Sequence, residues 1–111
     1  MINSKLHTIT SAFAEACKKI YGSRLESIIL FGSCARGDDE PDSDMDLLVL
    51  LNVPHEEAAK VQWDLLRISN KLSLKYDVVL SPVVQSYQTF TEYLSASGFF
   101  QSVVKEGVKI A

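Results

Sequence analysis

Two aspartates, Asp44 and Asp46, stand two residues apart where an apolar run, residues 47–51, begins. Side chains alternate along a β-strand, so both carboxylates are expected on the same side of the strand. Two negative charges held together against apolar surface are costly unless a cation lies between them. A divalent metal with a phosphate-bearing substrate on its far side is the usual solution. The pair therefore predicts metal-assisted phosphate chemistry at this end of the strand.

The segment before the pair has residues suited to phosphate. An earlier apolar run, residues 28–31, stops at Gly32 and Ser33. Gly32 has no Cβ, so the backbone can approach a phosphate closely. Ser33 offers a hydroxyl and a backbone N–H at the start of a short predicted helix. Arg36 either steadies the phosphates or pairs with a neighbouring aspartate, and the residues alone leave both interpretations open.

Two other loops that bind phosphate or metal do not fit. Gly32 and Gly37 have the glycine spacing of a Walker A loop, but two acids follow where that loop needs Lys and then Ser or Thr. An EF-hand counted from Asp42 would need glycine at the position of Leu47 and a bidentate acid at the position of Val53. Both interpretations are excluded.

The elements around the loop follow from periodicity. Residues 4–21 have one apolar face and end at a glycine, which predicts a helix. The other expected elements are strands at 26–31, 45–51 and 76–84, a helix from about 55 to 72, a helical tail at 87–106 interrupted near 97–98, and a possible last strand at 108–110. Pro82 restricts the third strand to an edge or a bulge. The pattern predicts one α/β domain over residues 1–111, a small mixed β-sheet with helices packed on it.

Composition narrows the class of protein. The formal net charge of −3 and the scattered eleven Lys and Arg residues argue against a long polynucleotide as ligand. The longest aliphatic run, residues 47–51, is far shorter than the roughly 20 residues that span a bilayer. Two cysteines do not suggest a disulfide framework. We therefore expect a cytoplasmic protein without a membrane segment.

The combined pattern resembles a known family. Residues 32–37 read Gly-Ser-Cys-Ala-Arg-Gly and residues 43–47 read Ser-Asp-Met-Asp-Leu. This arrangement, together with the apolar runs at 28–31 and 47–51, resembles the signature of the minimal nucleotidyltransferases, small members of the DNA polymerase β-like superfamily. The expected order of helices and strands resembles that family over nearly the whole chain.

The resemblance implies a reaction and a set of site residues. Family members transfer a nucleoside monophosphate, usually AMP from ATP, to an acceptor hydroxyl with two Mg²⁺ ions. It implies metal-binding roles for Asp44 and Asp46, and nucleotide-binding roles for Gly32, Ser33 and Arg36. A third carboxylate, which activates the acceptor or binds metal, corresponds to Asp77 at the start of the strand expected at 76–84. The simpler interpretation of Asp77 is a charge at a strand end.

The resemblance also implies a partner. Many family members are antitoxins of HEPN-domain toxins, and some adenylylate the toxin. Because the chain is short, we expect the acceptor to be presented by another protein or by a second copy of the chain, with a tyrosine hydroxyl as the target. Tyr87, Tyr93, Phe99 and Phe100 are the expected partner contacts. Two alternatives stay open: an antitoxin that acts by contact alone and only retains nucleotide affinity, and an adenylyltransferase for a small molecule such as an aminoglycoside.

Overall fold

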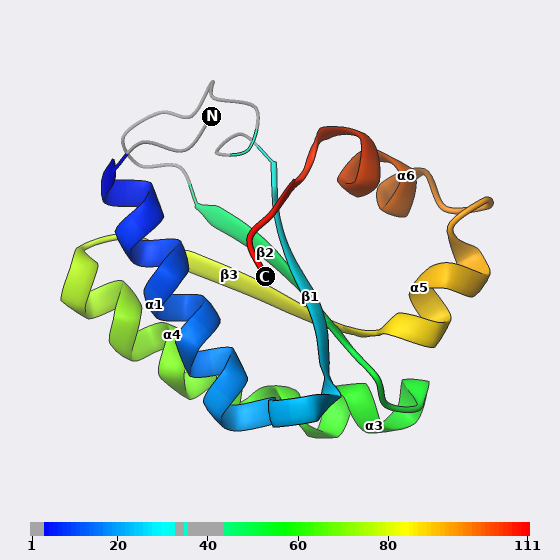
Figure 1. Ribbon diagram of the computed structural model, residues 1–111, viewed down its shortest axis with the longest axis horizontal. Coiled ribbons are helices and arrows are strands. Elements are labelled where there is room, and N and C mark those ends of the chain that lie inside the picture. Colours follow the sequence, from blue (N-terminus) through cyan, green and yellow to red (C-terminus); the bar gives the residue numbers. More distant parts are fainter. Residues whose placement is uncertain (1–3, 33–34, 36–43) are drawn as a thin grey trace.

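A computed structural model describes residues 4–32, 35 and 44–111 (Figure 1). The described elements, in chain order, are α1 (Ser4–Tyr21), the 3-10 turn η1 (Gly22–Arg24), β1 (Leu25–Phe31), β2 (Met45–Leu51), α3 (His55–Lys60), α4 (Gln62–Tyr76), β3 (Leu80–Ser86), α5 (Tyr87–Tyr93), α6 (Gly98–Glu106) and β4 (Val108–Lys109). The short helix expected after Gly32 falls outside the described residues, apart from Ala35.

The four strands form one mixed sheet in the order β3-β2-β1-β4. β1 runs antiparallel to both β2 and β4, whereas β2 and β3 are parallel. The predicted fold class, a small mixed sheet with helices, is therefore confirmed. Pro82 lies in β3, an edge strand with one side unpaired within this sheet, where a residue without an N–H is tolerated.

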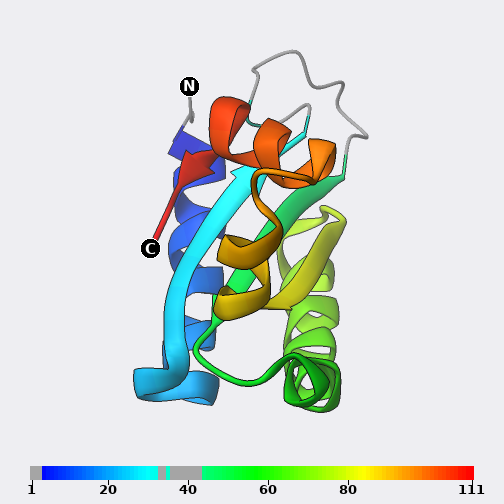
Figure 2. The same cartoon turned by 90° about the vertical axis from the view of Figure 1, so that its right-hand side faces the viewer.

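Helices cover both faces of the sheet (Figure 2). On one face α1, α3 and α4 enclose the larger core, whose central members include Phe13 of α1, Leu47 of β2 and Leu65 of α4, all fully buried. On the other face α5 and α6 cover a smaller core of Leu48, Leu50, Phe90, Phe100 and Val103. The alternation of β2 between two cores explains why its sequence is apolar at almost every position.

Two expected boundaries were wrong. The helix expected over residues 55–72 is two helices, because Val61 leaves the helical region at φ −91° and ψ 2°. The third strand begins at Leu80 rather than at residue 76, because α4 continues to Tyr76 and Asp77 then adopts a left-handed conformation with φ 53°. Asp and Asn tolerate this conformation better than other residues with a Cβ, and no glycine or proline marks the turn.

The single described cysteine, Cys17, lies in the larger core. Burial raises the pKa of its thiol to about 12, so it is a packing residue rather than a nucleophile. Among the described helices, none combines the length and the apolar character needed to cross a membrane.

Candidate functional site

The sheet positions Asp46 at one end of β2. Asp46 pairs with Phe31 of β1 on one side and with Ser81 of β3 on the other. Because side chains alternate, its carboxylate projects from the same face as Leu48 and Leu50, the face that α5 and α6 partly cover. Asp44 precedes β2 by one residue and is exposed. The predicted pair thus stands where a buried strand meets solvent.

Gly32 lies directly against this pair. It follows β1 and has φ +77°, which residues with a side chain rarely adopt. A Cβ built at Gly32 would overlap the Oδ2 atom of Asp46. Glycine is required here for two separate reasons, the backbone angle and the space that the carboxylate occupies.

The two carboxylates repel one another in the absence of a cation. Partial burial, and secondarily the negative charge of Asp44, raise the pKa of Asp46 above its usual value. No described group of three or more His, Cys, Asp and Glu side chains is arranged to hold a metal. Mg²⁺ commonly binds through one or two protein carboxylates and completes its shell with water and substrate phosphates. Asp44 and Asp46 fit that donor set.

The raised pKa predicts an effect on stability. A carboxyl whose pKa is higher in the folded than in the unfolded state binds protons more tightly when folded, so its contribution to stability falls as pH rises through that range. In EDTA at pH 7 we expect Asp46→Asn to unfold at a higher temperature than the wild type. Near pH 3, where the carboxyl is protonated, the difference should vanish. Thermal unfolding followed by circular dichroism measures both, with the exposed Asp64→Asn as control. A variant less stable than the wild type at pH 7 would contradict the repulsion.

Ser81 is a site residue that the sequence did not reveal. Its hydroxyl donates a hydrogen bond of 3.3 Å to Oδ2 of Asp44. The contact arises because β3 pairs in parallel with β2 and places Ser81 beside Asp46. Ser81 therefore orients the Asp44 carboxylate, and only the register of the two strands could have identified it.

Among the described residues, Asp77 does not join Asp44 and Asp46 in a group of three side chains that could hold a metal. It is the C-terminal cap of α4 and lies three residues before β3 begins. Two residues after Asp77, the carbonyl of Val79 accepts a hydrogen bond of 2.8 Å from the Met45 N–H at the start of β2. With its left-handed backbone, Asp77 has a structural reason to be Asp that is independent of catalysis. Its catalytic role stays a prediction from the resemblance.

Substitution of Asp77 separates the two roles. Because Asn also tolerates the left-handed region, Asp77→Asn should keep turnover within about twofold if Asp77 only ends α4. If Asp77 acts in the reaction, turnover should fall at least about tenfold. Asp77→Ala should lower the free energy of unfolding by about 1 kcal/mol, and Asp77→Gly, which has no Cβ penalty, is the matched control. Initial rates and chemical denaturation measure these quantities. A tenfold or greater loss of turnover in Asp77→Asn at unchanged stability would place Asp77 in the site.

Ser33 and Arg36, the other predicted nucleotide ligands, lie outside the described residues. Their roles stay predictions.

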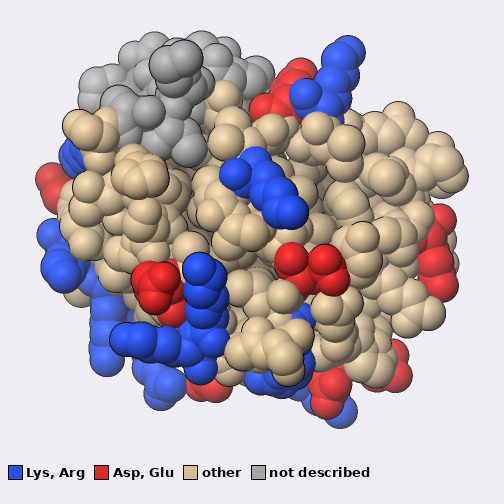
Figure 3. All heavy atoms as spheres, in the orientation of Figure 1, with Lys and Arg blue, Asp and Glu red and all other residues tan. Residues whose placement is uncertain are grey.

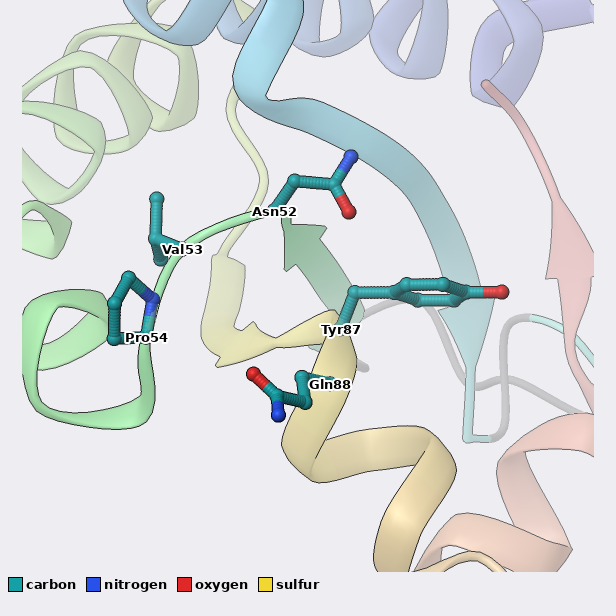
Figure 4. A pocket seen from close by; sticks show the side chains of 5 residues that line it. All are labelled: Asn52, Val53, Pro54, Tyr87 and Gln88. Carbon is teal, nitrogen blue, oxygen red and sulfur yellow. The ribbon is translucent and has the colours of Figure 1, made fainter.

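A pocket of about 270 Å³ lies at the opposite end of β2 from the aspartates. Its walls are Asn52, Val53 and Pro54 after β2, and Tyr87 and Gln88 at the start of α5 (Figure 4). The Tyr87 ring extends from α5 alongside the sheet. None of these five residues carries a charge, so this pocket offers no carboxylate to bind a metal, in contrast to the aspartate end.

Comparison with known proteins gives the chain a family. The family model of the nucleotidyltransferase domain matches residues 11–109. Two relatives from Methanocaldococcus jannaschii carry the name "Putative protein adenylyltransferase". One is 37% identical over 95 residues, which cover 86% of this chain and 87% of the relative. The other is 34% identical over 86 residues, which cover 78% of this chain and 85% of the relative.

Solved structures agree on the fold. A structure described as a "putative minimal nucleotidyltransferase" superposes with a TM-score of 0.63 at 22% identity, covering 97% of this chain and 95% of that one. A toxin–antitoxin structure with AMP-PNP gives a TM-score of 0.58 at 20% identity, covering 92% and 72%. The acid pair at the end of β2, the glycine against it and the family match agree, and the chain belongs to the nucleotidyltransferase domain family, in the minimal nucleotidyltransferase fold.

Proposed function

We propose that this nucleotidyltransferase transfers AMP from ATP to a hydroxyl of a partner protein, with Mg²⁺ held by Asp44 and Asp46. The observation that carries the proposal is that these two carboxylates lie together at the start of β2, with Gly32 in contact with Asp46. The relatives named as protein adenylyltransferases support a protein acceptor. The structural neighbour with AMP-PNP supports an adenine nucleotide as donor.

The chain's own residues have distinct tasks in this reaction. Asp44 and Asp46 supply the oxygens that bind the metal, and the Ser81 hydroxyl fixes the orientation of Asp44. Gly32 keeps the backbone close to the carboxylates without a side chain in between. When bound, Mg²⁺ supplies charge neutralisation for the phosphates. Ser33 and Arg36 complete the phosphate contacts in this proposal.

The chemical step is a displacement at the α-phosphorus. The acceptor oxygen forms a bond to this phosphorus, and the bond to the oxygen that bridges the α- and β-phosphates breaks. The bonding electron pair leaves with pyrophosphate, and the hydroxyl proton passes to solvent water. A phosphodiester between the acceptor and AMP results, with a tyrosine hydroxyl as the proposed acceptor.

We propose a HEPN-domain toxin as the partner, since structural neighbours are toxin–antitoxin assemblies. The surface formed by α5 and α6 suits such a contact, because Tyr87, Tyr93 and Val104 are 36% to 57% exposed. At the right of Figure 3, most of this side is formed by residues other than Lys, Arg, Asp and Glu. Phe100 was expected among the contacts but lies in the smaller core, 9% exposed.

The exposed aromatic surface also favours a second candidate function, in which the protein neutralises the partner by contact alone. Labelled ATP separates the two. ATP labelled at the α-phosphate should transfer its label to the partner, whereas ATP labelled at the γ-phosphate should not. No transfer from either, with complex formation intact, would leave contact as the function. Transfer from the γ-label would make the protein a kinase and overturn the proposal.

A further inference from the structure

A small pocket adjoins the aspartate pair and is not used by the proposed phosphate contacts. Its walls are Phe31 and Gly32 at the end of β1, and Phe99, Ser102, Val103 and Glu106 of α6. In Figures 1 and 2, α6 lies at the end of the sheet where β1 stops and β2 starts. The pocket and the aspartates share a wall, because Gly32 lines the pocket and also lies against Asp46.

We propose that this pocket holds the nucleobase of the donor nucleotide and that Glu106 selects bases with an exocyclic amino group. The assignment rests on the proposed function and deepens it. The nucleoside is bonded to the α-phosphate, so it must lie beside the carboxylates that bind the phosphates. Phe31 is the cross-strand partner of Asp46 and also lines the pocket, so the pocket lies next to these carboxylates.

The size and walls of the pocket suit a flat ring. Its volume is about 100 Å³, several times the roughly 30 Å³ of a water molecule and well below the 300 Å³ or more that holds a drug-sized ligand. The rings of Phe31 and Phe99 meet edge to face, with centroids 5.4 Å apart and planes at 83°. Phe99 is nevertheless 48% exposed. Phe99 also packs against Phe100, with ring centroids 5.8 Å apart, and the exposed part of its ring is a stacking surface for a base.

The polar groups of the pocket supply selectivity. Glu106 contributes a carboxylate, which when ionised only accepts hydrogen bonds. Adenine and cytosine present an exocyclic amine that can donate to it, whereas the corresponding group of uracil is a carbonyl oxygen. The Ser102 hydroxyl, on the same helix, can donate to a ring nitrogen. We therefore expect ATP to bind more tightly than UTP.

Calorimetry with three ligands tests the assignment: Mg·ATP, Mg·UTP and Mg·tripolyphosphate, the last with no base. Phe99→Leu should weaken Mg·ATP by at least about fivefold and leave Mg·tripolyphosphate unchanged. Phe99→Tyr, which keeps the ring, should restore the affinity. Glu106→Gln should reduce the preference for ATP over UTP by at least about threefold. Trp63→Leu and Glu56→Gln, exposed positions on α4 and α3, are the matched controls.

The outcomes are distinct. Equal Mg·ATP affinity in Phe99→Leu and Trp63→Leu would overturn the base pocket while leaving the proposed function in place. A change confined to the KM of the protein acceptor would assign the pocket to the acceptor and overturn it as well. A Phe99→Tyr variant as weak as Phe99→Leu would also overturn it. Failure of the wild type to bind either Mg·ATP or Mg·tripolyphosphate would overturn the proposed function and this assignment together.

Discussion

Replacing Asp44 or Asp46 by asparagine is expected to lower kcat/KM for AMP transfer by at least about 10²-fold. Asparagine keeps the shape of aspartate but lacks the negative charge that binds Mg²⁺. Without metal the two carboxylates repel one another, so removing one charge should leave the protein folded. Asp46→Asn should therefore be more stable than the wild type in EDTA. Pyrophosphate release gives the rate, and calorimetry gives the affinity for Mg·ATP.

Asp64→Asn is the matched control for this loss. Asp64 is an exposed aspartate of α4 that forms a 3.0 Å ion pair with Arg67, away from the site. Surface pairs of this kind contribute about 1 kcal/mol or less, so its loss should not change turnover. Wild-type turnover and wild-type Mg·ATP affinity in Asp44→Asn and Asp46→Asn would remove the pair from the reaction.

Gly32→Ala is expected to damage the site more than the fold. The added methyl group would collide with Oδ2 of Asp46, and φ +77° is unfavourable for alanine. We expect a loss of about 1–2 kcal/mol in the free energy of unfolding and at least a tenfold loss of turnover, because the carboxylate must move. Chemical denaturation and initial rates measure the two effects.

A second glycine, Gly22, separates the effect of backbone strain from the effect of the collision with Asp46. Gly22 also has a positive φ, +55°, but a Cβ there would meet nothing within 4 Å. Gly22→Ala should therefore lose a similar amount of stability and keep full turnover. If both glycine variants kept full turnover, contact between Gly32 and Asp46 would have no role in catalysis.

The sequence predicted the parts of the site that lie close together along the chain. Asp44 and Asp46 are related by strand alternation, and Gly32 is marked by the end of an apolar run. Pro82 restricted the third strand to an edge or a bulge, and β3 lies at the edge of the sheet. Each of these inferences needs only local rules of backbone geometry.

The predictions that were wrong, and the site residue that the sequence did not reveal, depend on contacts between segments that are distant in the sequence. Ser81 reaches Asp44 through the register of β2 and β3, which periodicity does not reveal. The start of β3 was misplaced because Asp77 ends α4 in a left-handed turn without glycine or proline. Phe99 and Phe100 look equivalent in sequence, but the rotation of α6 buries Phe100 and exposes Phe99.

The most direct test of AMP transfer is the intact mass of the partner protein after co-expression with this chain. The account predicts a gain equal to one or more AMP units on the partner, and loss of that gain when Asp44 and Asp46 are both replaced by asparagine. Peptide mapping should then place the adduct on a hydroxyl. A tight complex with an unmodified partner, equally protective with and without the two aspartates, would contradict the account.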